Sequence, residues 1–339
     1  MKQITTIGLD LAKKVFQIHA VDASGAVVLQ RVLRRGKVQE FLAGLPPCLV
    51  GMEACATAHY WARELSKLGH EVRLIPPAYA KAYVRRNKND AADAAAICEA
   101  VSRPNMRFVV AKTEAQQAAA GVHKTRELLV KQSTMIINHL RGMMAEFGIV
   151  VAEGRQHAAE LVAILLDPAD TRIPAPLHQT LRVMADLWAG IERKLQGIDQ
   201  QLLDWGRGNQ TCRNLITIPG YGPILSSAMA AIVVDPSVFR SGREFAASLG
   251  LVPRHEGTGG HVKLGPISKR GNGYLRRLLV NGATSVLNSK RGKQDPWLRR
   301  LLESKPRKLV AVALANKMAR IGWAIITRQE NFRAAPATV

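Results

Sequence analysis

Four carboxylates have the spacing expected of a chemical site: Asp10, Glu53, Asp90 and Asp93. Asp10 ends the apolar run 4–9, and Glu53 ends a second apolar run at 48–52. A residue at the end of a strand is held rigidly, and two residues three apart share one helix face. In a chain with a formal net charge of +22, four converging acids indicate bound divalent cations and phosphate chemistry. Asp90 or Asp93 alone would be explained as a solvated charge on a helix.

Carboxylates that hold two Mg²⁺ ions about 4 Å apart can support phosphoryl transfer, with one ion at the nucleophile and one at the leaving oxygen. A strand-end Asp, a second strand-end acid and a helical pair supply that arrangement in ribonuclease-H-like folds. The ordered set is therefore stronger evidence than any single acid. We expect Mg²⁺ as the cofactor, with Mn²⁺ as the alternative, and Asp10, Glu53, Asp90 and Asp93 as both the metal ligands and the catalytic acids.

The elements that must position these acids follow from apolar periodicity and turn residues. Strands are expected at 3–10, 15–21, 26–30, 48–53 and 71–75, and helices at 38–45 and 58–68. Three strands in a meander followed by alternating helix and strand predict an α/β domain, with a parallel extension and helices on its faces.

The rest of the chain reads as helical. Helical spacing covers 78–147, 157–166 and 177–205, and apolar residues three to four apart in the last stretch suit either a coiled-coil stripe or ordinary core packing. Further helices are expected at 224–233 and up to about 326, with a disordered tail at 331–339. The fold class is therefore α/β plus α.

The sequence Pro219-Gly220-Tyr221-Gly222-Pro223 lies between two apolar helices. It is typical of a helix-hairpin-helix, in which Gly220 and Gly222 allow the backbone to approach a phosphate and the second helix offers its N-terminus to the anion. A plain tight turn between two helices is the alternative.

Charge and composition limit the class of partner. The chain has 339 residues and is 47% hydrophobic, enough for two or three domains with real cores. Residues 211–339 carry 21 Lys and Arg against 6 Asp and Glu, and such an excess indicates nucleic acid; a merely soluble basic surface is the alternative. No membrane span or signal peptide is expected. Four cysteines without a metal-binding spacing suggest reduced thiols in a cytoplasmic protein.

Five motifs carry a resemblance to a known family; they lie at 8–13 (Gly-Leu-Asp-Leu-Ala-Lys), 52–55 (Met-Glu-Ala-Cys), 87–94, 218–222 and 249–254 (Leu-Gly-Leu-Val-Pro-Arg). In this order, over nearly the whole chain, they resemble the DEDD transposases of the insertion sequence 110 family. The segment 59–63 (His-Tyr-Trp-Ala-Arg) is similar to its 1111 subgroup.

The resemblance implies a RuvC-like (ribonuclease-H-like) domain at 1–110, a helical or coiled-coil domain at 111–207 and a mainly helical transposase domain at 208–330. It implies a bacterial, nucleoid-associated recombinase that acts on double-stranded donor and target DNA, guided by a structured non-coding bridge RNA. It also implies homodimers that assemble into homotetramers, with the metal site and the attacking hydroxyl supplied by different protomers.

The family places a catalytic serine in a Gly-rich stretch after the Gly-Leu-x-Pro-Arg motif. Here the matching stretch is 255–260 (His-Glu-Gly-Thr-Gly-Gly), which contains no serine, so the alignment places Thr258 at the nucleophile position. A threonine hydroxyl can act as a nucleophile, although its methyl group hinders approach. A nearby serine such as Ser268, or a variant of reduced activity, remains an alternative. Ser241 is expected to cap a helix and not to act in catalysis.

Basic residues near these motifs are candidates for phosphate contacts. In the C-terminal third they are Arg254, Lys263, Lys269, Arg270, Arg276 and Arg277. Lys13 follows Asp10 closely enough to steer the scissile phosphate. For any one of these side chains, an exposed surface position is an equally good explanation.

Three functions remain open on the residues alone. The first is an RNA-guided DNA recombinase with a covalent protein–DNA intermediate. The second is a metal-dependent nuclease, such as a junction resolvase, in which water attacks. The third is a non-catalytic nucleic-acid-binding protein.

Overall fold

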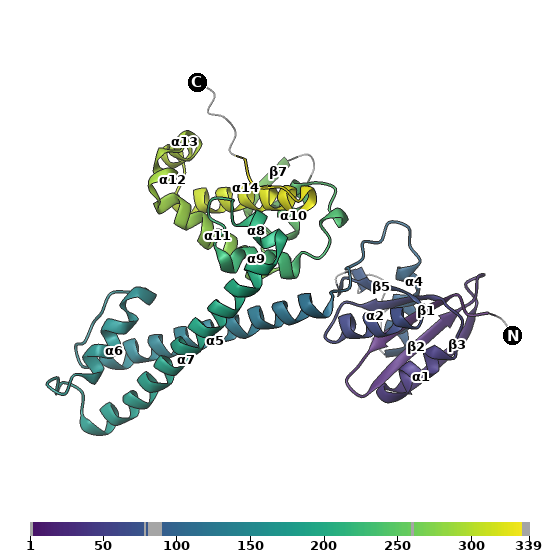
Figure 1. Cartoon of the computed structure of the whole chain (residues 1–339), viewed down its shortest axis with the longest axis horizontal. Coiled ribbons are helices and arrows are strands. Elements are labelled where there is room, and N and C mark those ends of the chain that lie inside the picture. The colour runs from purple at the N-terminus through teal and green to yellow at the C-terminus, as the bar shows by residue number, and fades with distance from the viewer. Residues whose placement is uncertain (1–2, 78, 81–89, 259–260, 334–339) are drawn as a thin grey trace. The chain divides into compact units, whose positions relative to one another are not determined.

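The chain forms two compact units, Met1–Ala115 and Gln116–Val339, in a computed structural model (Figure 1). The structure describes residues 3–77, 79–80, 90–258 and 261–333, and of residues 90, 255–256, 258 and 261–264 it describes the backbone alone. The division predicted from the sequence into domains ending at 110, 207 and 330 stays a prediction.

The first unit is built on a five-stranded sheet whose strands are β1 (Thr6–Leu11), β2 (Val15–Val21), β3 (Val27–Arg34), β4 (Leu49–Glu53) and β5 (Glu71–Ile75). Their order is β3-β2-β1-β4-β5, with β1, β2 and β3 antiparallel and β4 and β5 parallel to β1. The predicted meander and parallel extension are confirmed. β3 runs four residues beyond its predicted end because Arg34 still pairs with Val15.

Helices cover both faces of this sheet. Residues Ile7 and Leu9 of β1 point into a core shared with α1 (Val38–Ala43) and α2 (Ala58–Lys67). The residue between them, Gly8, lies on the opposite face, where α4 (Asp90–Val101) packs. Side chains alternate between the two faces of a strand, so the apolar side chains of β1 and its glycine serve different helices.

The prediction of one helical stretch over 78–147 is wrong in its middle. The segment 102–113 leaves the helix, and the Val109 N–H donates to the Leu74 carbonyl at 2.7 Å. This bridge satisfies backbone groups at the edge of β5. Pro104 lies in this segment and cannot continue the helix, so the sequence held a local signal for the break that the prediction missed. The free edge of β5 then pairs with Val109. Residues 78 and 81–89 of the predicted stretch lie outside the described residues.

The second unit begins with long helices, α5 (Glu114–Ala145), α6 (Ala158–Leu166) and α7 (Ala175–Gly208). They share one apolar core, to which α7 contributes Leu181, Ile191 and Leu195. Leu187 of the same predicted stripe is 53% exposed. Part of the apolar stripe of α7 therefore packs into the core of this unit, which is the core-packing alternative, and part of it is exposed.

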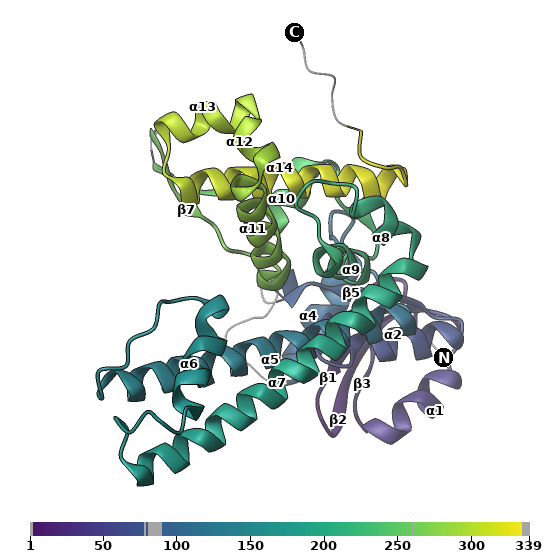
Figure 2. The ribbon, with the colours of Figure 1, turned by 60° about the vertical axis from the view of Figure 1, so that its left-hand side comes forward.

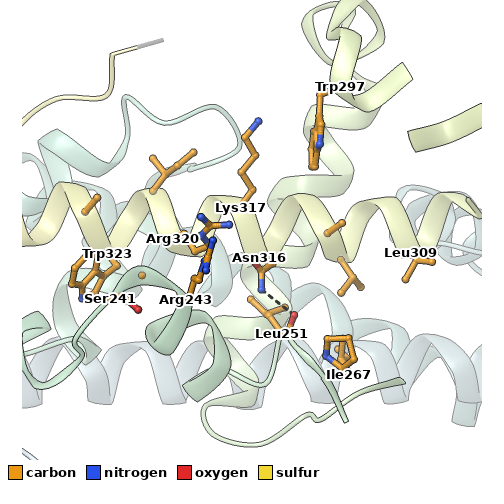
Figure 3. A pocket seen from close by; sticks show the side chains of 16 residues that line it. Ser241, Arg243, Leu251, Ile267, Trp297, Leu309, Asn316, Lys317, Arg320 and Trp323 are labelled. Carbon is orange, nitrogen blue, oxygen red and sulfur yellow. Dashed lines mark hydrogen bonds between the residues drawn. The ribbon is translucent and has the colours of Figure 1, made fainter. Parts of the chain in front are cut away.

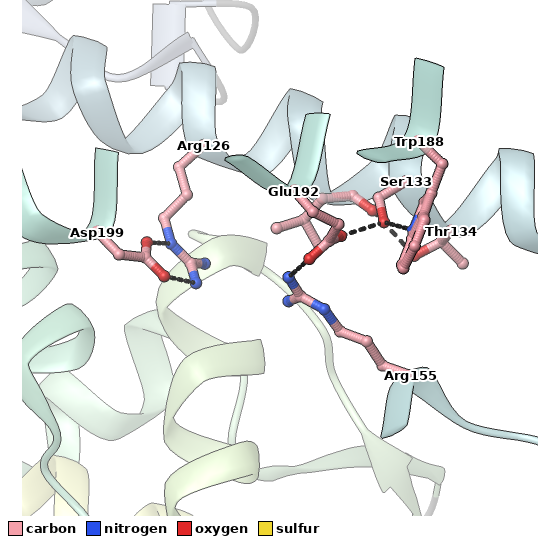
Figure 4. Close-up of polar contacts among 8 residues, drawn as sticks. Arg126, Ser133, Thr134, Arg155, Trp188, Glu192 and Asp199 are labelled. Carbon is pink, nitrogen blue, oxygen red and sulfur yellow. Dashed lines mark hydrogen bonds and ion pairs between the residues drawn. The ribbon is translucent and has the colours of Figure 1, made fainter. Parts of the chain in front are cut away.

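Polar contacts join α5 to α7 beside that core (Figure 4). Arg126 donates from Nε to Asp199 at 2.5 Å, and the Ser133 hydroxyl donates to Glu192 at 2.7 Å. The Trp188 indole donates in turn to the Ser133 oxygen at 3.1 Å. Because these groups are partly buried and paired, they fix the register of the two helices.

The C-terminal part of this unit is mainly helical, as predicted, and is shown from a second side in Figure 2. Its helices are α8 (Gln210–Leu215), α9 (Pro223–Ile232), α10 (Gly242–Ser248), α11 (Gly273–Asn288), α12 (Lys290–Gln294), α13 (Pro296–Ser304) and α14 (Arg307–Arg328). An antiparallel hairpin of β6 (Pro253–Thr258) and β7 (His261–Ile267) was not predicted.

Helix α14 crosses the middle of this core and contributes Leu314, Met318 and Ile325 to it. Among the described residues, it is the one helix long and apolar enough to cross a membrane by length and composition, and half of its apolar window is buried inside the unit. That burial is what a core helix of a folded domain shows.

The predicted disorder of the tail is wrong for its first residues. The Phe332 N–H donates to the Thr217 hydroxyl at 2.8 Å, and its ring packs against the core. The free energy gained by burying an aromatic ring outweighs the entropy cost of ordering a short segment. Residues 334–339 lie outside the described residues.

Replacing Gly220 by alanine should destabilise the second unit. Gly220 has φ +88°, and a Cβ there would lie 2.7 Å from Met318 Cε and 2.9 Å from the Gly282 oxygen. Left-handed strain of about 1–2 kcal/mol and overpacking of about 1–3 kcal/mol should add. Gly148→Ala is the matched control, since Gly148 has φ +72° with open space around it. Urea unfolding should show the larger loss of stability for Gly220→Ala, and equal losses would contradict the packing argument.

Candidate catalytic and nucleic-acid-binding sites

Asp10 and Glu53 come to neighbouring positions at one edge of the sheet. Strands β1 and β4 are parallel, with Leu9 opposite Met52. The next residue of each strand is the acid, and both acids are half-buried. The carboxyl ends of parallel strands form a common edge, which is where open α/β sheets bind ligands. Glu53 ends β4 as predicted, and β1 runs one residue past Asp10, to Leu11.

Two glycines bring α4 against the face that these acids share. Asp10 lies two residues after Gly8, and Glu53 lies two residues after Gly51, so each acid has the same facing as its glycine. A Cβ on Gly8 would lie 2.1 Å from the Ala94 oxygen, and one on Gly51 would lie 2.7 Å from Val101 Cβ. The helix therefore approaches the sheet as closely as backbone allows.

Helix α4 runs in the opposite direction to β1, so the acids in its first turn lie toward Asp10. The Cys98 thiol lies 3.8 Å from the Thr6 oxygen, and Gly8 meets Ala94 one helical turn earlier. Two strand residues advance about 6.6 Å and four helix residues about 6 Å, so the steps match. The next step along β1 is Asp10, and the next turn back along α4 is its first turn, which begins with Asp90 and contains Asp93.

Asp93 is half-buried, and its Oδ1 atom is buried without a hydrogen-bond partner in the described part of the chain. A buried carboxylate oxygen without a donor carries a desolvation cost that a bound cation or donor would remove. The side chain of Asp90 lies outside the described residues, and its backbone begins the helix.

The pKa of the Cys55 thiol is affected by both strand-end acids. Burial raises the pKa of the Cys55 thiol, and the carboxylates of Glu53 and Asp10 raise it further. Both acids therefore lie close enough to act on one thiol, which stays protonated and neutral near them. Sequence reasoning treated Cys55 only as a reduced thiol; its place two residues after Glu53 was the available signal.

The donor set fits a hard divalent cation in its chemistry. Carboxylate oxygens are the ligands that Mg²⁺ and Mn²⁺ prefer, and the Asp93 oxygen lacks a partner in the described part of the chain. Among the side chains that the structure describes, no three His, Cys, Asp or Glu residues are close enough together to hold a metal ion. Asp10, Glu53 and Asp93 thus share a face without forming a closed cluster.

Lys13 is exposed in the turn between β1 and β2, three residues beyond Asp10. An exposed lysine on a short turn can reach a phosphate from the solvent side. Its predicted role in steering the scissile phosphate stays a prediction.

The candidate nucleophile lies on the hairpin of the second unit. Thr258 ends β6 and pairs with His261, the first residue of β7. Ser268, the alternative, follows β7, and its N–H donates to the Val252 oxygen at 2.8 Å. The Ser241 hydroxyl accepts from the Glu244 N–H at 3.3 Å, so the predicted helix cap is confirmed.

Two predicted phosphate ligands have partners within the unit. Arg276 Nη1 donates to the Leu249 oxygen at 2.8 Å and to the Arg270 oxygen at 2.9 Å. Arg277 forms an ion pair with Glu127 of α5. Arginines that already hold carbonyls or a carboxylate have fewer donors for phosphate, so the structure gives both a positioning role that charge alone did not indicate.

The remaining predicted contacts differ in exposure. Arg254, Lys269 and Arg270 are exposed, and Lys263 lies on β7 with its side chain outside the described residues. Gly220 packs against α11 and α14, whereas Gly222 caps α9 with open space around its Cα. Of the two glycines predicted to approach a phosphate, Gly222 is exposed and Gly220 is half-buried.

Two further glycines lock the base of the hairpin. Gly250 has φ +70°, and a Cβ there would lie 2.5 Å from the Arg270 backbone; Gly271 has φ +71°, and its Cβ would lie 1.8 Å from the Ser248 oxygen. The Lys269 N–H also donates to the Gly250 oxygen at 3.2 Å. The segments before β6 and after β7 therefore cross backbone to backbone, which requires glycine.

Two family models match regions of the chain. Residues 7–149 match a transposase family model of the DEDD type named for IS110, and residues 212–302 match the model described as "Transposase IS116/IS110/IS902 family". The two matched regions contain the strand-end acids and the hairpin respectively.

Individual relatives match along nearly their whole length. A Pseudomonas aeruginosa protein named "Probable family 20 transposase" is 47% identical over 334 residues, which cover 97% of this chain and 99% of the relative. The transposase for IS1328 of Yersinia enterocolitica is 39% identical, covering 97% and 98%. The transposase for IS1111A of Coxiella burnetii is 37% identical, covering 98% and 92%. The chain therefore belongs to the IS110/IS1111 family of insertion-sequence transposases, which are DNA-recombining enzymes with a DEDD domain.

Proposed function

We propose that this protein cuts and rejoins the DNA of its own insertion sequence. In this proposal the metal-binding acids are Asp10, Glu53, Asp90 and Asp93, and the nucleophile is Thr258. The observation that carries the proposal is the shared edge of Asp10 and Glu53 on the face of the sheet that α4 covers. The strand order β3-β2-β1-β4-β5 supports a ribonuclease-H-like, RuvC-type fold for this unit.

The four acids would hold a divalent cation, with Mg²⁺ favoured and Mn²⁺ as the alternative. When bound, the cation would supply Lewis-acid stabilisation of charge on the scissile phosphate. The chain's own contribution is rigidity, because strand ends and a closely packed helix fix the carboxylates before substrate arrives. The unpartnered Oδ1 of Asp93 supports its place in this set.

Thr258 would act as the nucleophile. Its hydroxyl oxygen forms a bond to phosphorus while the bond from phosphorus to one DNA oxygen breaks, and the hydroxyl proton is lost as that DNA oxygen gains one. The product is a covalent phosphothreonine link, which a DNA hydroxyl can later attack to rejoin a strand. The place of Thr258 at the tip of a hairpin supports this role, because a hairpin tip can reach into a DNA groove.

The partners proposed are double-stranded donor and target DNA and a structured guide RNA, bound by a homodimer that assembles into a homotetramer. The charge of residues 211–339, with 21 basic and 6 acidic side chains, supports nucleic acid as the partner. The exposed Lys13, Arg254, Lys269 and Arg270 are the proposed phosphate contacts. The reaction would take place at the nucleoid in a bacterial cytoplasm.

A nuclease that uses water as the nucleophile is the second candidate function. The observation that favours it is the composition of the Gly-rich stretch, which has threonine in place of serine. The acids alone would suffice for hydrolysis. A protein–DNA adduct that survives denaturation separates the two functions, since hydrolysis leaves none.

Asp93→Asn should abolish strand cleavage while leaving DNA binding and folding intact. Loss of a metal-binding charge should lower the rate by about a thousandfold or more, because such a site stabilises the transition state by several kcal/mol. Glu99→Gln is the matched control, since Glu99 is an exposed carboxylate on the same helix that pairs with Arg103. Cleavage of a labelled duplex measures the effect. Mg²⁺ should raise the melting temperature of the parent protein and of Glu99→Gln, but not that of Asp93→Asn. Equal cleavage by Asp93→Asn and Glu99→Gln would contradict the assignment.

Thr258→Ala should remove both strand cleavage and the covalent adduct, whereas Thr258→Ser should keep both, with a rate equal to the parent's or higher because the methyl group is lost. The adduct is detected as labelled DNA that stays with protein in a denaturing gel. Ser268→Ala serves as the control and should keep both activities. If Ser268→Ala loses the adduct and Thr258→Ala keeps it, the nucleophile has been assigned to the wrong residue.

One discrete RNA should co-purify with the protein expressed together with its element's ends. We expect the purified particle to have the mass of a dimer or tetramer with bound RNA, measured by light scattering and by sequencing of the extracted nucleic acid. An active complex that contains no RNA would refute the guided mechanism and leave the cleavage chemistry untouched.

A further inference from the structure

A large groove opens beside the base of the β6–β7 hairpin, within the second unit (Figure 3). Its volume is about 1080 Å³, and α14 forms its floor. Apolar side chains make up most of the wall; among them are Leu251, Ile267, Trp297, Leu309, Val312 and Trp323. A contiguous apolar surface of this size that stays exposed commonly marks a binding site.

Three cations line the same groove. Arg243 of α10 and Lys317 and Arg320 of α14 are exposed in it and are labelled in Figure 3. Arg320 packs against Gly242, the residue before Arg243. In the described part of the chain, none of the three forms an ion pair. Like charges that gather without an acid favour a bound anion, because the anion removes their mutual repulsion.

The aromatic groups are placed for stacking. Trp297 is 37% exposed, and the Lys317 ammonium lies 4.4 Å from the centre of its ring. Trp323 donates from its indole nitrogen to the Pro236 oxygen at 2.9 Å, so its hydrogen-bonding need is met outside the groove and its ring is fixed. An exposed indole next to lysine and arginine is the combination that binds the bases and phosphates of unpaired nucleic acid.

The hairpin connects this groove to the proposed nucleophile. Pro253 and Ile267 line the groove and pair with each other at the base of the hairpin, while Thr258 lies at its other end. Five strand steps separate Pro253 from Thr258, about 17 Å, which is the length of about five base pairs of duplex DNA at 3.4 Å each. An unpaired strand is more extended and spans this distance with fewer nucleotides. A DNA strand held at Thr258 would therefore reach the groove with the nucleotides next to the cut.

We propose that this groove binds unpaired nucleotides of the DNA strand that is cut beside Thr258, with bases against Trp297 and phosphates beside Arg243, Lys317 and Arg320. The choice of DNA as the occupant rests on the function proposed above; the aromatic and cationic lining stands without it. Stacking would hold the cut strand away from its complement, so that it stays available for rejoining.

Binding by the full-length protein tests this proposal, measured by fluorescence anisotropy with a short labelled single-stranded DNA in the presence of EDTA, which prevents cleavage. Trp297→Ala should weaken binding at least about fivefold, since stacking on an aromatic ring contributes about 1–3 kcal/mol per base, and Trp297→Phe should restore most of it. Lys317→Gln should lower the slope of log K against log salt by about 0.7, as one lost phosphate contact to a single strand predicts.

The controls separate the groove from general charge and from folding. Lys308→Gln removes an exposed charge from the same helix outside the groove and should leave Trp297-dependent stacking unchanged. A duplex of the same sequence should bind Trp297→Ala and parent protein equally. Unchanged single-strand binding by Trp297→Ala, an equal loss for the duplex, or a loss for RNA of the same sequence alone would each overturn the proposal. Because no cleavage is measured, these outcomes leave the roles of Asp93 and Thr258 undecided by this experiment.

Discussion

The close approach of α4 to the sheet is the constraint on which the acidic site depends. Gly8 and Gly51 leave no room for a side chain, so the helix backbone rests against the strands. Asp10 and Glu53 lie two residues further along those strands. If the helix stood off by the width of one methyl group, it would move away from the face that both acids share. The acids are therefore set in place by two residues that have no side chain at all.

Much of the first unit could be predicted because its signals are local. Alternation of apolar residues and clear turns define the strands up to residue 75, and the strand ends define the places of Asp10 and Glu53. The break at 102–113 had a local signal in Pro104, which the helical reading overlooked. Its pairing with the free edge of β5, by contrast, depends on the tertiary structure. The geometry of the four acids also depends on how closely α4 packs, which is a property of the tertiary structure.

The second unit shows a different limit. The β6–β7 hairpin is Gly-rich, and glycine has low strand propensity, so the pattern of residues 253–267 gave no strand signal. The charge pattern likewise identified basic residues but could not identify their partners within the fold. Arg276 donates to two carbonyls, and Arg277 forms an ion pair with Glu127. Trp297 and Lys317 lie twenty residues apart, on different helices, and only the folded chain brings the ammonium over the ring.

The crossed backbones at Gly250 and Gly271 have a consequence for how this protein can change. They lock the base of the hairpin, together with the Arg276 contacts. A side chain at either glycine would force the segments before β6 and after β7 apart. Neither position can therefore vary without strain in both segments. Positions 250 and 271, far apart in the sequence, form a single constraint on how this chain can diverge.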